Sequence, residues 1–202
     1  FSEMGGADAP LQMVQSRRAN TYIDRIFQHV LTNRDLTPVR TVPFRKGWGN
    51  DEMVFDSPGV NVPGVSLDRY PFAAYHTHYD NMDLVHEDRL EEVVDILLQV
   101  ADEFERDFIP HPQQRVPVYL SRFDLYSDWT FERGSYDDNL KIIDGMWSGL
   151  SVTDNALKNG VSVDYAHAYI KKLVKLGLVR KVPVSPEYSK VTQFEILRHG
   201  LA

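Results

Sequence analysis

The sequence contains no cysteine, which excludes disulfide bonds, thiolate zinc sites and a cysteine nucleophile. No apolar run approaches the roughly 18 residues that a membrane-spanning helix needs. A Walker loop, a dinucleotide-binding glycine fingerprint, a nucleophile elbow and a His-Glu-x-x-His motif are also missing. We therefore expect a cytoplasmic protein that does not contact a membrane and whose function no single short motif reveals.

The composition is that of a globular protein, and the charge divides it in two. Hydrophobic residues make up 43% and charged residues 25% of the 202 residues, which suits one or two domains. The net charge of −7 argues against nucleic-acid binding by the whole chain. However, residues 140–202 carry +4 and the remainder carries −11. A shift of this size predicts two units with different surfaces.

A proline-rich segment separates the two parts. Ile109–Pro117 holds three prolines, which cannot continue a helix or a central strand, and we interpret it as a linker. The predicted organisation is a first domain over residues 1–112, a junction over 113–138 and a second domain over 139–202.

The first part alternates short strand patterns with helix patterns. The strand patterns are Leu11–Gln15, Val39–Phe44 and Val60–Leu67, and a polar loop, Arg45–Gly59, lies between the last two. Thr21–Leu31 has helical spacing, with Asn20 placed as its N-cap. This order predicts an α/β layered fold.

The clearest helix pattern is Glu87–Phe108. Its expected apolar stripe consists of Leu90, Val93, Val94, Leu97, Ala101, Phe104 and Phe108. Its expected polar face consists of Glu91, Asp95, Asp102, Glu105 and Arg106.

The second part predicts three helices followed by a hairpin. The helices are Asn139–Trp147, Val152–Lys158 capped by Ser151, and Val163–Leu176 capped by Ser162. Two β-like runs follow, Val179–Val184 and Lys190–Ile196. This order is typical of a winged helix. The expected outer face of its third helix consists of Asp164, Tyr165, His167, Ala168, Lys171, Lys172 and Lys175.

The densest cluster of reactive side chains is the segment His76-Thr77-His78-Tyr79-Asp80. Imidazole and carboxylate are the usual zinc ligands in a protein without thiolates. Of His76 and His78, we expect one at most to bind a given ion. A hydrogen-bonded loop with a solvated histidine is the alternative.

Two further acidic positions stay open at this point. Asp51 and Glu52 follow a glycine and could ligate a metal, bind a substrate amine or lie in a solvated turn. Glu3 lies in a segment that resembles the end of a strand, and it is either a paired structural acid or a ligand.

Taken in order, these motifs carry a family resemblance. Asp51-Glu52-x-x-Phe55, Val60-x-x-Pro63 and Tyr75-His76-Thr77-x-x-Asp80-Asn81 precede a long amphipathic helix. This order resembles the closing part of the co-catalytic zinc aminopeptidase and glutaminyl cyclase superfamily. It is most similar to a bacterial aminopeptidase-like family with a fused C-terminal winged helix-turn-helix domain. The resemblance covers nearly the whole chain and implies part of a three-layer sheet domain followed by a winged helix.

The resemblance also assigns roles to individual residues. It places the family's last metal-ligand histidine at His76 and a carboxylate ligand at Glu3, in a two-zinc site that hydrolyses peptide or amide bonds. Asn50 replaces the family's usual serine, and His78 replaces a small residue. Four side chains are implied around the metals or the substrate: Asp51, Glu52, Asp80 and His78.

The same family needs groups that would precede Glu3: an early His-x-Asp, a bridging Asp and a Glu pair that supplies the general base. We therefore expect this chain alone to bind zinc weakly or not at all and to have no catalytic activity. Its expected partner is a missing N-terminal half or another chain along the sheet edge, with a homo-oligomer as the alternative.

Two other functions remain as alternatives. A winged-helix DNA-binding regulator with an α/β sensing domain is favoured by Lys171, Lys172 and Lys175. The absence of arginine from that helix opposes it, and we do not expect specific nucleic-acid binding. The other alternative is a catalytically inactive interaction module.

Overall fold

The computed structural model describes residues 1–34, 39–47, 49–116, 118–128, 130 and 133–190. It divides into two compact units. The first comprises Phe1–Glu105 together with helix α7 (Pro186–Lys190), and the second comprises Arg106–Ser185. Within the described ranges, no helix is long and apolar enough to cross a membrane.

The first unit is built on a small mixed sheet. Its strands are β1 (Leu11–Val14), β2 (Arg40–Val42) and β3 (Ser66–Arg69), in the order β2-β1-β3. Strand β1 runs parallel to β2 and antiparallel to β3, with Met13 opposite both Thr41 and Leu67. Every residue of β1 and β3 is buried, so these two strands form the centre of the unit.

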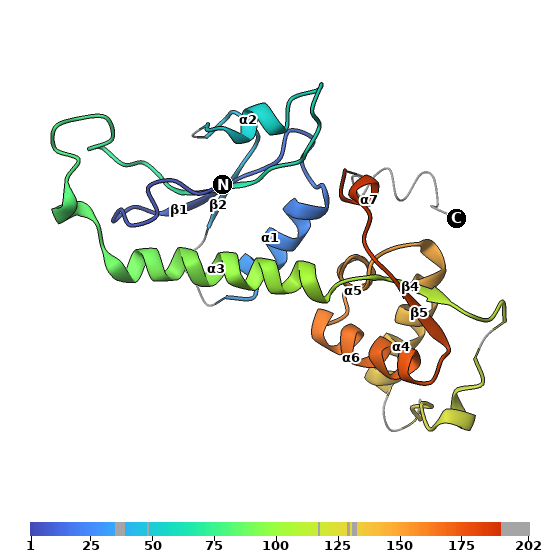
Figure 1. Cartoon of the computed structure of the whole chain (residues 1–202). Coiled ribbons are helices and arrows are strands. Elements are labelled where there is room, and N and C mark those ends of the chain that lie inside the picture. The colour runs from blue at the N-terminus through green and yellow to red at the C-terminus, as the bar shows by residue number, and fades with distance from the viewer. Residues whose placement is uncertain (35–38, 48, 117, 129, 131–132, 191–202) are drawn as a thin grey trace. The chain divides into compact units, whose positions relative to one another are not determined.

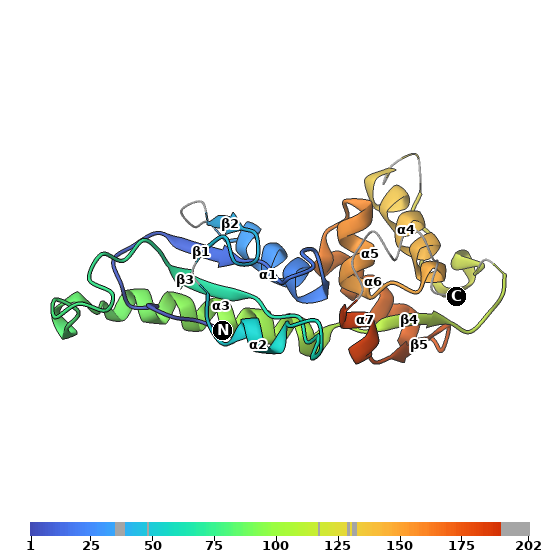
Figure 2. The same ribbon diagram turned by 90° about the horizontal axis from the view of Figure 1, so that it is seen from above.

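Helices cover the sheet, which confirms the predicted α/β fold class. Figure 1 shows α1 (Tyr22–Thr32) and α3 (Glu87–Arg106) on one side of the sheet and the short α2 (Glu52–Phe55) on the other. In Figure 2 the strands β1 and β3 run alongside α3. A 3₁₀ turn, η1 (Met82–Leu84), precedes α3. Helix α7 packs on α1, where Tyr188 meets Tyr22 edge to face with ring centroids 5.6 Å apart.

The N-cap of α1 is Thr21, so the prediction of Asn20 is wrong. The Asp24 carboxylate accepts hydrogen bonds from the Thr21 backbone N–H at 2.9 Å and from the Thr21 hydroxyl at 2.6 Å. The same carboxylate accepts from the Ser16 N–H at 2.8 Å. An acid three residues after the N-cap stabilises the first turn of a helix. Asp24 therefore places the N-cap of α1 at Thr21. Asn20 instead takes a left-handed conformation with φ of 55°.

Helix α3 exposes part of its predicted apolar stripe. Val93, Ile96 and Val100 are buried, whereas Val94 and Ala101 are exposed. The predicted apolar stripe is therefore wider than the buried face of α3, because the unit covers only one side of the helix.

Two local predictions between β2 and α3 also need correction. The segment Arg45–Gly59 contains the helical turn α2 rather than being wholly loop. The strand expected over Val60–Leu67 begins only at Ser66, because Pro63 and Gly64 interrupt a strand.

The second unit is mainly helical. Its helices are α4 (Arg133–Gly145), α5 (Val152–Asn159) and α6 (Val163–Lys175), with 3₁₀ turns η2 (Leu120–Phe123) and η3 (Met146–Ser148). Its buried core includes Ile142, Met146, Ala166, Ile170 and Leu173.

The helix ends of this unit follow the predicted capping. The Ser151 hydroxyl accepts from the Asp154 N–H at 3.1 Å, and the Ser162 hydroxyl accepts from the Tyr165 N–H at 3.4 Å. Gly160, at the C-cap of α5, has φ of 65°, a left-handed conformation that favours glycine. Both helix starts and this stop were therefore correctly predicted from short-range patterns.

The proline-rich segment is not purely a linker. Strand β4 (Ile109–Pro112) pairs antiparallel with β5 (Val179–Val182). A two-stranded sheet consists only of edges, which is where proline is tolerated. The N-terminal stretch of the first unit runs to Glu105, and the predicted domain boundary at residue 112 stays a prediction. The second strand of the predicted hairpin, Lys190–Ile196, lies outside the described residues except for Lys190. The winged helix therefore remains a prediction.

Candidate functional site

The segment that ends at Glu3 is hydrogen-bonded to β3 and to Val65, which precedes it. The Phe1 amino group donates to the Val65 carbonyl at 3.0 Å, and the Leu67 N–H donates to the Phe1 carbonyl at 3.0 Å. This is the pattern of a parallel ladder, as expected for a strand end. The Glu3 N–H then donates to Asp68 Oδ1 at 3.0 Å. The next residue, Met4, has φ of 53° and turns the chain away from the sheet.

His76 lies on an exposed loop that is closed by its own hydrogen bonds. The Thr77 hydroxyl donates to the Ala74 carbonyl at 2.7 Å and accepts from the Tyr79 N–H at 3.2 Å. His76 has φ of 58°, a left-handed conformation that His adopts more readily than most residues other than glycine. Its ring stacks on Tyr75 with centroids 3.9 Å apart. His78 and Asp80 are exposed on the same loop.

A pocket brings Glu3 and Asp80 together. It has a volume of about 370 Å³, and Tyr75 also lines it, beside His76 in sequence. His76 and His78 are not among its lining residues. The pocket therefore joins Glu3 to the loop that carries His76, but His76 itself does not line it. However, among the described residues no three His, Asp or Glu side chains are grouped so that they could hold a metal.

Part of the pocket wall is apolar. Leu84, Val85 and Leu90 form it, beside Gly5 and Gly6. A Cβ atom at Gly6 would lie 2.8 Å from Val85 Cγ1, so only glycine fits at this close approach.

The acidic pair that follows Asn50 divides into an exposed and a buried side chain. Asp51 is exposed, whereas Glu52 is 1% exposed. Glu52 Oε1 accepts from the Asn50 N–H at 3.0 Å, and Glu52 Oε2 has no hydrogen-bond partner within the described residues. The sequence offered no means of telling these neighbours apart, because burial of Glu52 depends on its contact with the distant Gly64.

Sequence reasoning missed Asp68, a buried acid beside the predicted ligand. Its carboxylate accepts from the Ser66 hydroxyl at 2.8 Å in addition to the Glu3 N–H. Burial raises the pKa of Asp68, and the negative charges of Glu3 and Glu52 raise it further, against the lowering effect of its hydrogen bonds. An acid in the middle of a β-rich run was the sequence feature that could have identified it.

In the second unit, His167 of the predicted outer face of α6 is buried, which corrects that face, and Tyr169 on the same helix is buried as well. His167 is 2% exposed and Tyr169 is 5% exposed. His167 Nε2 lies 3.2 Å from the Thr153 hydroxyl and 3.7 Å from Asp107 Oδ1. Burial, then Arg106 and Lys171, lower the pKa of His167 to about 4. Burial, then Tyr165, raises the pKa of Tyr169 to about 12.

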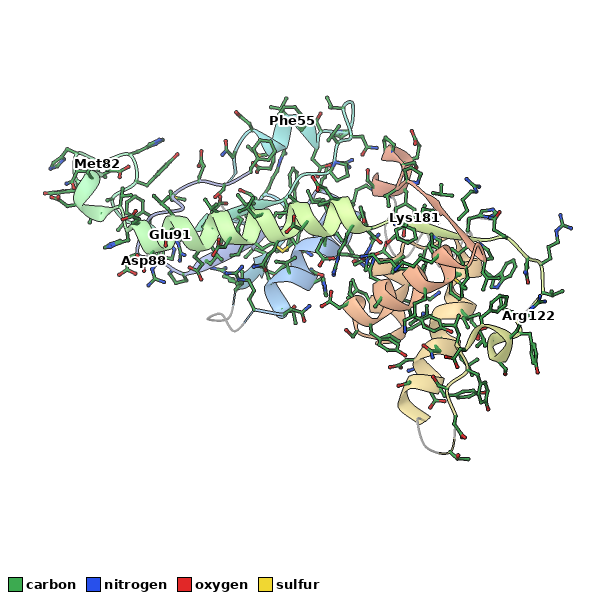
Figure 3. All side chains as sticks on the ribbon, turned by 60° about the horizontal axis from the view of Figure 1, so that its bottom comes forward. Phe55, Met82, Asp88, Glu91, Arg122 and Lys181 are labelled. Atoms are coloured by element: carbon green, nitrogen blue, oxygen red, sulfur yellow. The ribbon has the colours of Figure 1, made fainter. Side chains whose placement is uncertain are left out.

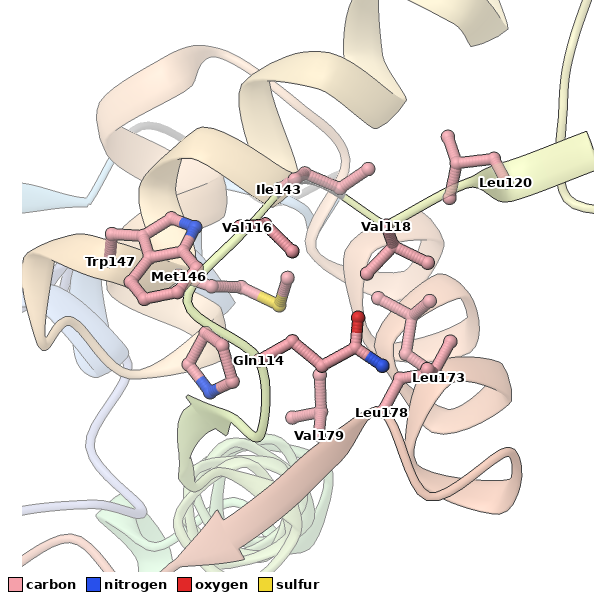
Figure 4. A pocket seen from close by; sticks show the side chains of 11 residues that line it. Gln114, Val116, Val118, Leu120, Ile143, Met146, Trp147, Leu173, Leu178 and Val179 are labelled. Atoms are coloured by element: carbon pink, nitrogen blue, oxygen red, sulfur yellow. The ribbon is translucent and has the colours of Figure 1, made fainter.

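The remaining features of this unit offer little specific chemistry. Lys171, Lys172 and Lys175 are exposed on α6, while Asp164 forms an ion pair with Arg106 at 2.6 Å. A small apolar cavity of about 20 Å³, shown in Figure 4, lies among residues that include Met146, Leu173 and Val179. It has room for about one water molecule and is too small for a substrate.

Comparison with known proteins identifies the first unit. Residues 1–107 match the family described as "Domain of unknown function (DUF4910)". The chain belongs to this family. A curated relative from Clostridium acetobutylicum, named "Putative polysaccharide biosynthesis protein with aminopeptidase-like domain", is 40% identical over 145 residues. The match covers 65% of this chain and 32% of the relative.

A solved structure shows the same fold. It is described as "Crystal structure of putative peptidase from Clostridium acetobutylicum" and superimposes with a TM-score of 0.68 at 23% identity. The match covers 90% of this chain and 41% of the solved chain. The resemblance to aminopeptidase-like proteins is thereby confirmed, and the fold is peptidase-like. The chain spans about a third of the curated relative's length.

Proposed function

We propose that the chain supplies part of the active site of a zinc-dependent, aminopeptidase-like hydrolase that cleaves peptide or amide bonds. The observation that carries the proposal is the pocket that joins Glu3 to Asp80 beside the His76 loop. Both halves of this pocket come from motifs of the family resemblance, although they are more than 70 residues apart in the sequence.

The donor atoms fit zinc in kind, though not in number. Glu3 would offer a carboxylate and His76 an imidazole, which are both common zinc ligands. A catalytic zinc usually has three protein ligands, and the described residues bring no such group together. When bound, the two metals would polarise the scissile carbonyl and lower the pKa of the attacking water. We therefore propose that this chain alone is inactive and that further ligands and the general base come from other polypeptide.

The other predicted residues would act around these two ligands. Asp80 would support the imidazole or bind the amino end of the substrate, since its carboxylate lines the pocket. Asp51 is exposed and free to approach a substrate, whereas Glu52 is buried and would act through its neighbours. His78 would remain a surface residue of the loop.

Zinc titration of the 202-residue chain tests the assignment. We expect weak binding in competition with a chromogenic chelator, with Glu3→Gln and His76→Ala each reducing the affinity. His78→Ala is the matched control, because it removes an imidazole from the same exposed loop. We expect no hydrolysis of an aminoacyl p-nitroanilide by the chain alone. Zinc affinity that is unchanged by His76→Ala but lost in His78→Ala would overturn the ligand assignment.

A further inference from the structure

Helix α3 has an apolar side that is wider than the first unit covers. Its buried face contains Val93, Ile96 and Val100. Beside this face, Leu90, Val94 and Leu98 recur every fourth residue and are 43%, 53% and 59% exposed. Residues four apart stack along one side of a helix, so these three form a continuous apolar ridge. Ala101 is exposed one turn further on the same side.

Acidic side chains border this ridge. Glu91, Asp95 and Asp102 are exposed and, at 100° per residue, lie next to the ridge on the side away from the buried face. Figure 3 marks Asp88 and Glu91 in the first turns of α3. The ridge is thus an apolar strip with negative charge along its free border, unlike the uniformly polar outer face of an ordinary surface helix.

We propose that this ridge is a docking site for an amphipathic helix of a partner protein, with lysine or arginine beside its apolar stripe. The ridge from Leu90 to Leu98 is about 12 Å long at 1.5 Å per residue, which suits two to three turns of a helix packed along it. The acidic border selects a basic partner by charge complementarity. It also disfavours a second copy, because two α3 helices packed ridge to ridge would bring the same carboxylates together.

Two synthetic peptides test the proposal on the full chain. Both are fluorescently labelled 18-residue helices with a leucine stripe, flanked by lysine in one and by glutamate in the other. We expect the lysine peptide to bind, as measured by fluorescence anisotropy, and the glutamate peptide to bind at least tenfold more weakly. The double substitution Val94→Ser with Leu98→Ser should weaken binding of the lysine peptide at least tenfold. Gln99→Ser, also exposed on α3 but on the acidic side away from the ridge, is the control and should leave it unchanged.

Charge reversal provides the second arm of the test. Glu91→Lys with Asp95→Lys should reverse the preference, so that the glutamate peptide binds more tightly than the lysine peptide. Equal binding of both peptides by the unmodified chain, or no effect of the Val94 and Leu98 substitutions, overturns the proposal. Sedimentation that shows a dimer dispersed by those substitutions also overturns it, because the occupant would then be a second copy.

Discussion

The two units differ in how far each encloses its own apolar side chains. In the second unit, α4, α5 and α6 bury Ile142, Val152 and Ile170 completely. In the first, α3 leaves Val94 and Leu98 more than half exposed, and Phe1 and Phe55 are also exposed. The second unit also exposes apolar side chains, such as Val116 at 62% and Trp147 at 51%, whereas in the first Leu90, Val94 and Leu98 form one exposed ridge along a helix.

This difference reflects the range over which each unit's contacts act. The helices of the second unit are consecutive and joined by short turns, such as residues 160–162 between α5 and α6, although its strands β4 and β5 pair across about 70 residues. The sheet of the first unit instead pairs β1 with strands about 30 and 55 residues away. Packing between consecutive helices is determined largely by nearby sequence. The order of strands in a sheet, and the helices that cover the sheet, depend on distant segments.

The largest contrast is expected from truncating one apolar residue in each unit. Ile170→Ala empties space in a closed core and should lower the free energy of unfolding of the second unit by about 3 kcal/mol. Leu98→Ala, at a side chain that is 59% exposed, should change stability by less than about 0.5 kcal/mol. Urea denaturation followed by circular dichroism measures both variants. Equal losses would mean that α3 is covered in solution and would remove the contrast.

Acid should destabilise the second unit through His167. Burial favours the neutral imidazole and lowers its pKa to about 4 from the ordinary value of 6.5. Between these values the unfolded chain binds more protons, so stability rises with pH across this range and falls as pH drops through it. The full loss on acidification is about 3 kcal/mol at 1.36 kcal/mol per pKa unit.

The Asp107 carboxylate, whose Oδ1 lies 3.7 Å from Nε2 of His167, opposes this effect, and burial still keeps the pKa of His167 at about 4. That oxygen already accepts hydrogen bonds from the Phe108 and Thr153 N–H groups, at 2.9 and 3.1 Å. Unfolding curves from pH 7 to pH 4 measure the slope. His167→Gln should flatten it, and a variant that keeps the full slope would assign the effect to another group.

The sequence predicted features that depend on neighbouring residues better than features that depend on contacts between distant segments. The helices of the second unit were identified with their caps at Ser151 and Ser162, because caps and 3.6-residue periodicity are local patterns. The burial of His167 was missed, since nothing near it in sequence shows that Thr153 and Asp107 lie beside it. In the first unit the three strands were identified. Strand β3, Ser66–Arg69, lies closer to the C-terminus than the predicted Val60–Leu67.

The candidate site was predicted only in part for the same reason. Glu3 and Asp80 were chosen from motif order, and the pocket brings them together. Asp68 was missed because its interest lies in burial beside Glu3, a contact across 65 residues of sequence. The different burial of Asp51 and Glu52 likewise depends on tertiary structure. The ligand roles of Glu3 and His76 stay a prediction.

A smaller loss is expected where α4 and α5 approach each other most closely. A Cβ atom at Gly145 would lie 1.8 Å from Asn155 Oδ1, and Asn155 is held by its own hydrogen bond to the Ile142 carbonyl at 3.0 Å. Gly145→Ala should therefore cost about 2 kcal/mol through forced displacement of a buried side chain. Gly134→Ala in the same helix has no atom within 4 Å and should leave stability unchanged or slightly raised. Thermal denaturation that fails to separate the two variants would show that α4 and α5 can separate at little cost.

The smallest change in the free energy of unfolding is expected from the helix caps, which allowed the helices of the second unit to be predicted from sequence. Ser151 is fully buried and its hydroxyl accepts from the Asp154 N–H, so Ser151→Ala should cost about 1 kcal/mol. Ser162 is exposed and its hydrogen bond is longer, at 3.4 Å, so Ser162→Ala should cost about half as much because water can replace the hydroxyl. Denaturant midpoints at constant slope measure this difference. Equal costs, or a larger cost at Ser162, would show that burial of the hydroxyl does not determine how much each cap stabilises its helix.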